Sequence, residues 1–153
     1  MPNTSHQLKL DSPLEQVWEF VSNVDNWAPL VKGYHSHHKL SVEQSIWTLK
    51  GEVGRIRKTM KIKIDIVEIT DFERIAFRMK GITDNLHGSG SFSAKKLTEK
   101  TTLVTGELSI KANGLIGPML NPLITSLLPR QLKELARSMC FQIEKQKHRA
   151  AIS

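Results

Sequence analysis

Residues 55–69, RIRKTMKIKIDIVEI, decide the fold class of this chain. Their apolar residues recur at every second position: Met60, Ile62, Ile64 and Ile66. Successive side chains of a β-strand point to opposite faces of its sheet, so this alternation predicts a strand with one apolar and one wetted face. The wetted face is basic and carries these side chains: Arg55, Arg57, Lys61 and Lys63.

Comparable alternation recurs on both sides of this stretch. The segments read SIWTLKGEV (45–53), RIAFRMKGI (74–82), GSFSAKKL (90–97) and TTLVTGELSIKA (101–112). Short connections containing Gly, Asp, Asn or Thr separate them, and such residues suit tight turns. Strands joined by tight turns pair in antiparallel order, so the middle of the chain predicts an antiparallel meander.

A short strand over residues 6–10 and then a helix are predicted ahead of the meander. In SPLEQVWEFV, Ser12 suits the N-cap of a helix, Pro13 its first position and Glu15 the position from which a carboxylate reaches back. The following stretch, VDNWAPLVKG (24–33), predicts an irregular or briefly helical connection that buries Trp27.

The last third of the chain is helical in pattern. In PMLNPLITSLLPRQLKELARSMCFQIEKQ (118–146), apolar residues recur at spacings of three and four, which predicts a long amphipathic helix. Pro129 falls within this pattern, so we expect it to kink the helix or to split it in two.

Together these segments predict one α+β domain over residues 1–153. We expect a curved antiparallel sheet of six or seven strands wrapped around the C-terminal helix, with one or two short helices after the first strand. The length of 153 residues, with 39% hydrophobic and 24% charged residues, suits a single soluble domain.

Composition also limits the location and the chemistry. No secretory signal pattern is found, and no window approaches the ~18 apolar residues of a membrane span. Cys140 is the single cysteine, which excludes an internal disulfide and a cysteine-based zinc site. Its amphipathic surroundings favour a small core residue over a nucleophile. We therefore expect a cytoplasmic protein that is peripheral to a membrane if it contacts one.

The chain resembles a known superfamily in three stretches: SPLEQVWEFVSNVDNWAPLVKG, GSGSFS and TTLVTGELSIKANGLIG. With the final helix, they look like the helix-grip superfamily of START and polyketide cyclase/dehydrase proteins, also called SRPBCC. Within it the chain is most similar to the carbon monoxide dehydrogenase G group. The resemblance implies a hydrophobic small molecule, such as a lipid, a quinone or a polyketide, held between sheet and helix.

The residues that we predict to line such a cavity come from the apolar phases of the strands and from the helix. They are Trp27, Trp47, Leu49, Met60, Ile62, Ile64, Phe77, Met79, Phe92, Leu108, Ile110, Leu120, Ile124 and Leu128. Periodicity alone favours a filled core at these positions, whereas the resemblance favours a cavity. Gly88 and Gly90 leave one face of their strand bare, for close approach of the helix or for open volume.

Three histidines stand close together in GYHSHHKL (33–40). In an extended strand, His35 and His37 point to one face and His38 points to the other, so the three cannot converge on one metal ion. We predict no metal and no cofactor, and we place Tyr34, His35 and His37 at the rim of the pocket.

The formal net charge of +7 raises the question of an anionic partner. The row of Arg55, Arg57, Lys61 and Lys63 lacks the interleaved aromatic residues of RNA-binding sheets, which makes nucleic acid the least favoured partner. An anionic membrane surface, contacted by this row or by the basic C-terminal helix, ranks above it, and a plain solvated face ranks first. A protein partner is not identifiable from the sequence.

We therefore expect a protein that binds or carries a hydrophobic small molecule and is not an enzyme. The resemblance to the carbon monoxide dehydrogenase G group implies an accessory role in a membrane-linked oxidoreductase system. A polyketide cyclase or dehydratase is the first alternative, and it requires titratable groups on the pocket wall. A protein-interaction module without a ligand is the second, and it requires a core without a cavity.

Overall fold

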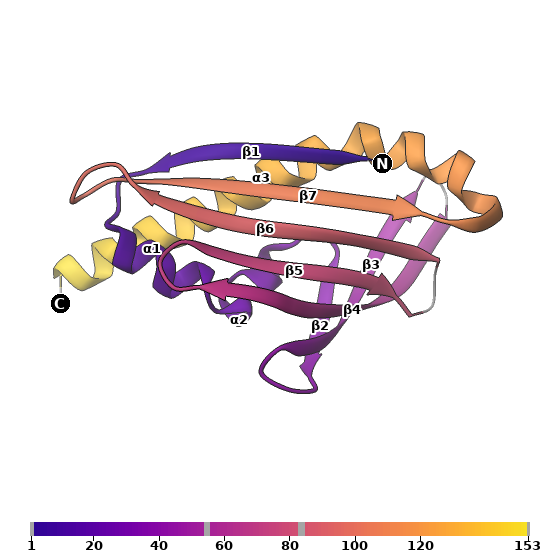
Figure 1. The fold of residues 1–153 in the computed structure, drawn as a ribbon, viewed down its shortest axis with the longest axis horizontal. Coiled ribbons are helices and arrows are strands. Elements are labelled where there is room, and N and C mark those ends of the chain that lie inside the picture. The colour runs from indigo at the N-terminus through magenta and orange to yellow at the C-terminus, as the bar shows by residue number, and fades with distance from the viewer. Residues whose placement is uncertain (1, 54–55, 83–84, 153) are drawn as a thin grey trace.

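The computed structural model describes residues 2–53, 56–82 and 85–152, with side chains except at 52–53, 56 and 147–152. Its described strands form one sheet in the order β1-β7-β6-β5-β4-β3-β2, with every neighbouring pair antiparallel (Figure 1). The strands are β1 (Asn3–Leu10), β2 (Tyr34–Lys39), β3 (Gln44–Val53), β4 (Ile56–Thr70), β5 (Arg74–Gly81), β6 (Leu86–Lys96) and β7 (Thr102–Ala112). The predicted meander is confirmed from β2 to β7, and β1 pairs with β7.

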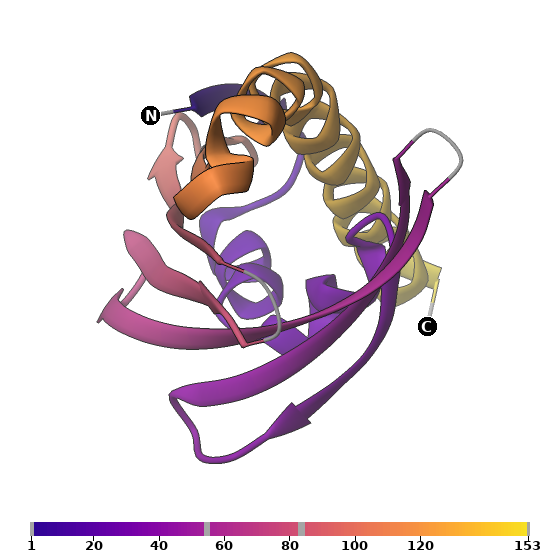
Figure 2. The same cartoon turned by 90° about the vertical axis from the view of Figure 1, so that its right-hand side faces the viewer.

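The helices lie on one side of this sheet. Three short ones connect β1 to β2: α1 (Leu14–Val21), α2 (Val24–Trp27) and the 3-10 turn η1 (Ala28–Leu30). A second 3-10 turn, η2 (Gly114–Ile116), leads into the long C-terminal helix α3 (Gly117–Ile152). The sheet curves around the space beside α3 (Figure 2), which confirms the predicted α+β helix-grip fold.

The alternation in β4 places its apolar side chains on the inner face of the sheet, which is the face toward α3. Ile64 pairs with Met79 on β5, and Ile62 pairs with Trp47 on β3. A strand with one buried face keeps this register, because a slip by one residue would turn its apolar set outward.

An aromatic cluster fills the inner face beside α1 and α2. Trp27 is only 2% exposed, and its ring lies 5.8 Å from Trp47, 5.7 Å from Phe77 and 5.1 Å from Phe92, measured between centroids. Its Nε1 donates a hydrogen bond of 3.0 Å to the Val21 carbonyl. The connection between β1 and β2 thus supplies the central side chain of the core.

The start of α1 differs from the prediction. The helix begins at Leu14 with Pro13 as its N-cap residue, and no side chain caps it. Ser12 is fully buried, its carbonyl accepts a hydrogen bond from Thr102 Oγ1, and its own Oγ has no partner among the described residues. The proposed Ser12 cap is therefore wrong, because that side chain is committed to the packing between α1 and β7.

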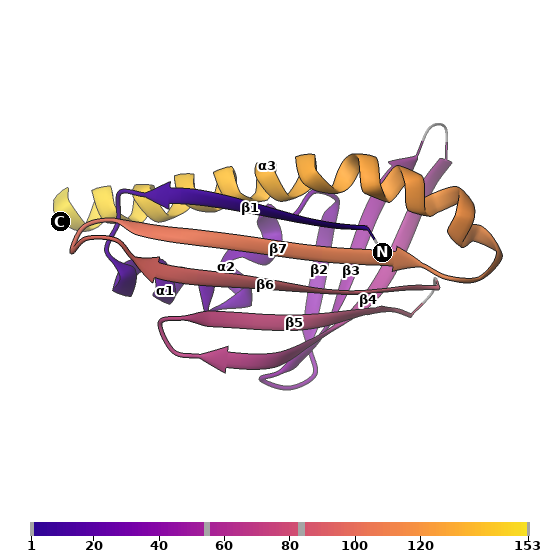
Figure 3. The same ribbon diagram turned by 45° about the horizontal axis from the view of Figure 1, so that its top comes forward.

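Helix α3 continues through both of its prolines, so the predicted split at Pro129 does not occur. The helix arches over its first half (Figure 1), as expected where a proline removes a backbone hydrogen bond. It packs along β1 and β7 (Figure 3). No described helix is long and apolar enough to span a membrane.

Candidate functional site

The predicted cavity residues divide into two groups by burial. Six are buried in the core: Trp27, Trp47, Ile64, Phe77, Phe92 and Leu128. The others stay half-buried: Leu49, Met60, Ile62, Met79, Leu108, Ile110, Leu120 and Ile124. The first group surrounds the aromatic cluster, whereas the second covers the inner face of the sheet and the facing first half of α3. We call the second group the inner aliphatic wall.

The wall is incompletely sealed on both of its sides. Leu49 pairs with Met60 and Met79 lies beside Gly88, so these apolar side chains share the inner face, yet none reaches core burial. Helix α3 packs on β1 and β7, at one edge of the sheet, and leaves the inner face of the middle strands less covered. An apolar region with partial access to solvent is the kind of surface that small apolar ligands cover.

A small enclosed cavity of about 20 Å³ lies at the other end, under the second half of α3. Phe92, Gly106, Met139 and Ile143 are among its lining residues, and His6 and Cys140 also border it. This volume holds about one water molecule, so it is no ligand site.

A larger hollow of about 630 Å³ lies on the opposite, outer face of the sheet. Its outward-pointing lining includes Arg74, Arg78, Ser89, Ser91 and Glu107. This lining is polar and does not suit the apolar ligand that the sequence predicts.

The bare patch predicted at Gly88 and Gly90 is covered by the sheet itself. A Cβ at Gly90 would lie 2.6 Å from the Phe77 ring, and one at Gly88 would lie 2.2 Å from the Ser109 carbonyl oxygen. Close approach of the helix occurs instead at Gly106, where a Cβ would lie 3.2 Å from Leu132. The two glycines therefore make room for neighbouring strand atoms and for neither of the two predicted uses.

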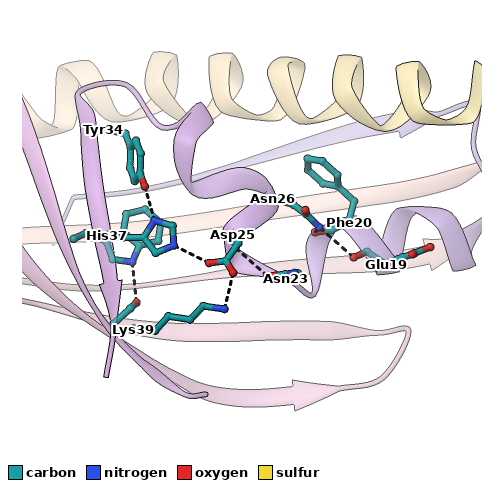
Figure 4. Close-up of polar contacts among 10 residues, drawn as sticks. Glu19, Phe20, Asn23, Asp25, Asn26, Tyr34, His37 and Lys39 are labelled. Carbon is teal, nitrogen blue, oxygen red and sulfur yellow. Dashed lines mark hydrogen bonds and ion pairs between the residues drawn. The ribbon is translucent and has the colours of Figure 1, made fainter. Parts of the chain in front are cut away.

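A chain of polar contacts lies at the edge of the inner face, on β2 (Figure 4). The Tyr34 hydroxyl lies 2.5 Å from His37 Nδ1, and His37 Nε2 lies 2.7 Å from Asp25 Oδ1. The second carboxylate oxygen of Asp25 lies 2.7 Å from Lys39 Nζ. We call these four residues the Tyr34–Asp25 relay.

The local backbone brings the relay together. A bulge shifts the register of β2 between Tyr34 and Ser36, so Tyr34 pairs with Leu49 and His37 pairs with Trp47 on the same inner face. His35 and His38 are exposed. The expectation that His35 and His37 share a face is therefore wrong, because the extra residue of a bulge inverts the alternation beyond it.

Helix α2 holds the carboxylate in place. The Asn23 side chain caps the helix by accepting a hydrogen bond of 3.0 Å from the Asp25 amide. The Asn26 side chain donates to the Phe20 carbonyl at 3.2 Å, which ties α2 to the end of α1 (Figure 4). Asp25 thus approaches β2 from a separately anchored element.

The charges of the relay set its protonation. Hydrogen bonds from Lys39 and then from His37 hold the pKa of Asp25 below its ordinary value, against a smaller opposing effect of burial. Asp25 is therefore a carboxylate at neutral pH, and a carboxylate only accepts hydrogen bonds. This arrangement can orient His37 and can move a proton between His37 and Tyr34.

Sequence reasoning found Tyr34 and His37 but missed Asp25 and Lys39. Asp25 lies twelve positions before His37 and in another element, so no periodicity links them. The only usable signal was the D/N-rich start of a short helix next to a buried tryptophan, VDNW, which marks a helix that the core fixes in position.

Other chemically capable groups carry less. Burial, followed by the nearby Glu144, raises the pKa of the Cys140 thiol to about 11, which leaves it protonated at neutral pH. Among the described residues, no group of three or more His, Cys, Asp or Glu side chains is placed to hold a metal ion.

The basic row of β4 lies on the outer face. Arg57 and Lys61 are exposed, and Lys63 lies 4.0 Å from Asp65. Arg55 lies outside the described residues. The row is thus separated from the inner aliphatic wall by the thickness of the sheet.

Comparisons with known proteins agree with this fold. A family model whose description consists only of the suffix "-like" matches residues 1–147. No curated protein sequence matches the chain. A START superfamily protein from Mycobacterium smegmatis is 16% identical with a TM-score of 0.72, over 94% of this chain and 98% of that one.

Two enzymes share the fold at similar distances. The Zhui aromatase/cyclase from Streptomyces sp. R1128 is 17% identical with a TM-score of 0.64, over 94% of each chain. A norcoclaurine synthase mutant from Thalictrum flavum, solved with a transition-state analogue, is 13% identical with a TM-score of 0.68, over 95% of each chain. Identities this low show a common fold and no common activity.

Proposed function

Because the chain belongs to the family whose model matches residues 1–147 and has the fold of START-type proteins, we propose that it binds and carries an apolar small molecule. The site is the region between the inner aliphatic wall of the sheet and the first half of α3. A lipid, a quinone or a polyketide-like molecule fits its chemistry.

One observation carries this proposal: facing apolar side chains from two elements remain half-buried. Met79 and Ile110 on the sheet and Leu120 and Ile124 on α3 all retain solvent access. Each square ångström of apolar surface removed from water contributes about 25 cal/mol, so a ligand that covers both walls gains affinity without polar contacts. Met60 and Met79 add flexible side chains that adapt to a ligand's shape.

Native mass spectrometry of protein purified from its own host tests the proposal, followed by thermal shift with lipids and quinones. We expect a co-purified apolar molecule and a rise in Tm. Ile110→Trp should fill the site and weaken binding at least about tenfold, whereas Lys111→Trp places the same ring on the exposed side of β7 as a control. A protein without bound lipid and without a shift for any apolar compound would sink the proposal.

Carriage also requires exchange with a membrane, and the start of α3 supports contact with an anionic surface. Four apolar side chains form an exposed row at spacings of four: Leu115, Met119, Leu123 and Leu127, at 101%, 65%, 43% and 48% exposure. No charged residue lies between Lys111 and Arg130, and the next charges are Lys133 and Arg137 with Glu134. Apolar side chains beside basic ones bind anionic bilayer surfaces.

Vesicle flotation tests this contact. We expect binding to vesicles with anionic lipid, weaker binding in salt, and loss in a Met119→Ser, Leu123→Ser double variant. Leu97→Ser removes a comparably exposed apolar side chain elsewhere and serves as the control. Lys61→Glu tests the outer basic row as the alternative surface. Equal binding of neutral and anionic vesicles would contradict the electrostatic part.

The accessory role in a membrane-linked oxidoreductase rests on the resemblance of residues 12–33 to the carbon monoxide dehydrogenase G group. Deleting the gene in its host should lower quinone-dependent oxidoreductase activity in isolated membranes, and adding back the protein should restore it. Unchanged activity would remove this role and leave ligand binding intact.

A polyketide cyclase or dehydratase is a second candidate, which one observation favours. The Tyr34–Asp25 relay puts a histidine and a phenol, each able to exchange protons, at the edge of an apolar wall. Incubation with a β-hydroxy ketone, followed by ultraviolet absorbance of the conjugated product, tests it. Turnover that His37→Ala abolishes and His38→Ala retains supports the enzyme; absence of turnover removes it.

A further inference from the structure

Tyr34 stands where the aromatic cluster meets the inner aliphatic wall. Its half-buried ring packs edge-on against Trp47, with centroids 6.2 Å apart, and its strand partner is Leu49 of the wall. The nearest polar group of the cluster is already used, because Trp47 Nε1 donates to Ser45 Oγ at 2.9 Å. The Tyr34 hydroxyl is therefore the polar atom that a molecule along this part of the wall meets first.

The contacts of the relay fix the direction of each hydrogen bond. Lys39 carries only donors, so the Asp25 carboxylate accepts from it and accepts again from His37 Nε2. His37 Nε2 must then carry the hydrogen. In a neutral imidazole this leaves Nδ1 without one, so Tyr34 donates its single hydroxyl hydrogen to Nδ1. The hydroxyl oxygen keeps only its capacity to accept.

A chain of aligned hydrogen bonds strengthens that acceptor. Each bond polarises the next, and the carboxylate at the end of the chain draws the hydrogen of Tyr34 toward His37. The oxygen of Tyr34 thus carries more negative charge than that of an isolated phenol. A ligand group that donates a hydrogen bond is stabilised there, and a group that only accepts is repelled.

We propose, on the basis of the proposed function, that the Tyr34 oxygen recognises the polar end of the ligand and selects a hydroxyl group. The ligand class is an apolar molecule that ends in an alcohol, a phenol or a hydroquinone. The corresponding ether, ketone or quinone has the same apolar body but no hydrogen to donate. The relay thus separates the reduced from the oxidised form of a quinone-like ligand.

Matched probe pairs test this selection: dodecanol against its methyl ether, and a short-chain ubiquinol against its ubiquinone. Isothermal titration should show the hydroxyl form binding about fivefold more tightly, the size of one net hydrogen bond. Tyr34→Phe should abolish the difference and leave the affinity for the ether unchanged. His35→Ala and His38→Ala alter exposed neighbours outside the relay and should keep the difference.

A second measurement uses the unaltered protein. The ¹³Cζ resonance of Tyr34 should shift when dodecanol binds and stay in place when the ether binds. Equal affinity within both pairs, or a preference that survives in Tyr34→Phe, would overturn the inference and leave apolar binding standing. If neither member of any pair binds, the proposed function fails together with it.

Discussion

At the scale of single residues, Asp25 couples the relay to acid stability. Its pKa is lowered from 3.8 by Lys39 and by His37, so the carboxylate stabilises the fold above that value and the contribution disappears as the pH falls through the lower folded pKa. Asp25→Asn should cost at most about 1 kcal/mol near neutral pH, because the side chain is 44% exposed. Urea unfolding of both proteins should show this difference shrinking below about pH 4; a difference independent of pH would contradict the assignment.

Cys140 makes an independent prediction at the same scale. With the pKa of its thiol raised to about 11 from 9.0, the thiolate fraction at about pH 8 falls by about a hundredfold. Alkylation by iodoacetamide should be slower than that of a free thiol by a similar factor, followed by mass spectrometry. In urea the same cysteine should react at the ordinary rate, which controls for the reagent.

The relay shows which parts of a site a sequence hides. His37 was placed at the rim because it stands in a strand, and that position can be predicted from the glycine and strand pattern around it. Its partner Asp25 could not be, because their contact depends on how α2 packs over β2. The bulge at His35 was equally hidden, since one inserted residue leaves no mark on a polar stretch such as YHSHHK.

At the scale of elements, β6 depends on a glycine that the sheet itself requires. A Cβ at Gly90 would meet the buried Phe77 ring at 2.6 Å, so Gly90→Ala should destabilise the protein by about 1–3 kcal/mol through forced repacking. Gly51→Ala is the matched control in β3, where a Cβ would meet nothing within 4 Å. Denaturant unfolding should separate the two; equal losses would mean that strand propensity rather than packing governs both.

Helix α3 illustrates what periodicity can and cannot predict. Its spacing of apolar residues correctly indicated one long helix, but gave Leu123 and Leu132 the same rank. The structure buries Leu132 and leaves Leu123 43% exposed. The difference arises because the helix packs on the sheet only along part of its length, and the curvature of a sheet is not written in the sequence of the helix.

At the scale of the whole molecule, the interior has two unlike halves. Under the second half of α3, Met139 and Ile143 close against β1, β6 and β7 around a cavity of about 20 Å³. Under the first half, the walls are aliphatic and half-buried. The sequence predicted an apolar interior for the whole length, but only the packed half needed to be filled for the fold to be stable.

This division predicts an uneven pattern of hydrogen exchange. Amides of residues 118–128 in α3 should exchange faster than those of residues 132–145, because local opening is easiest where few apolar side chains are buried. A bound apolar ligand should slow exchange in the first segment and in β4 and β5, and should leave the second segment almost unchanged. Exchange followed by mass spectrometry on the free and ligand-bound protein measures both. Uniform protection along α3 before and after binding would mean that the first half is packed as tightly as the second and holds no ligand.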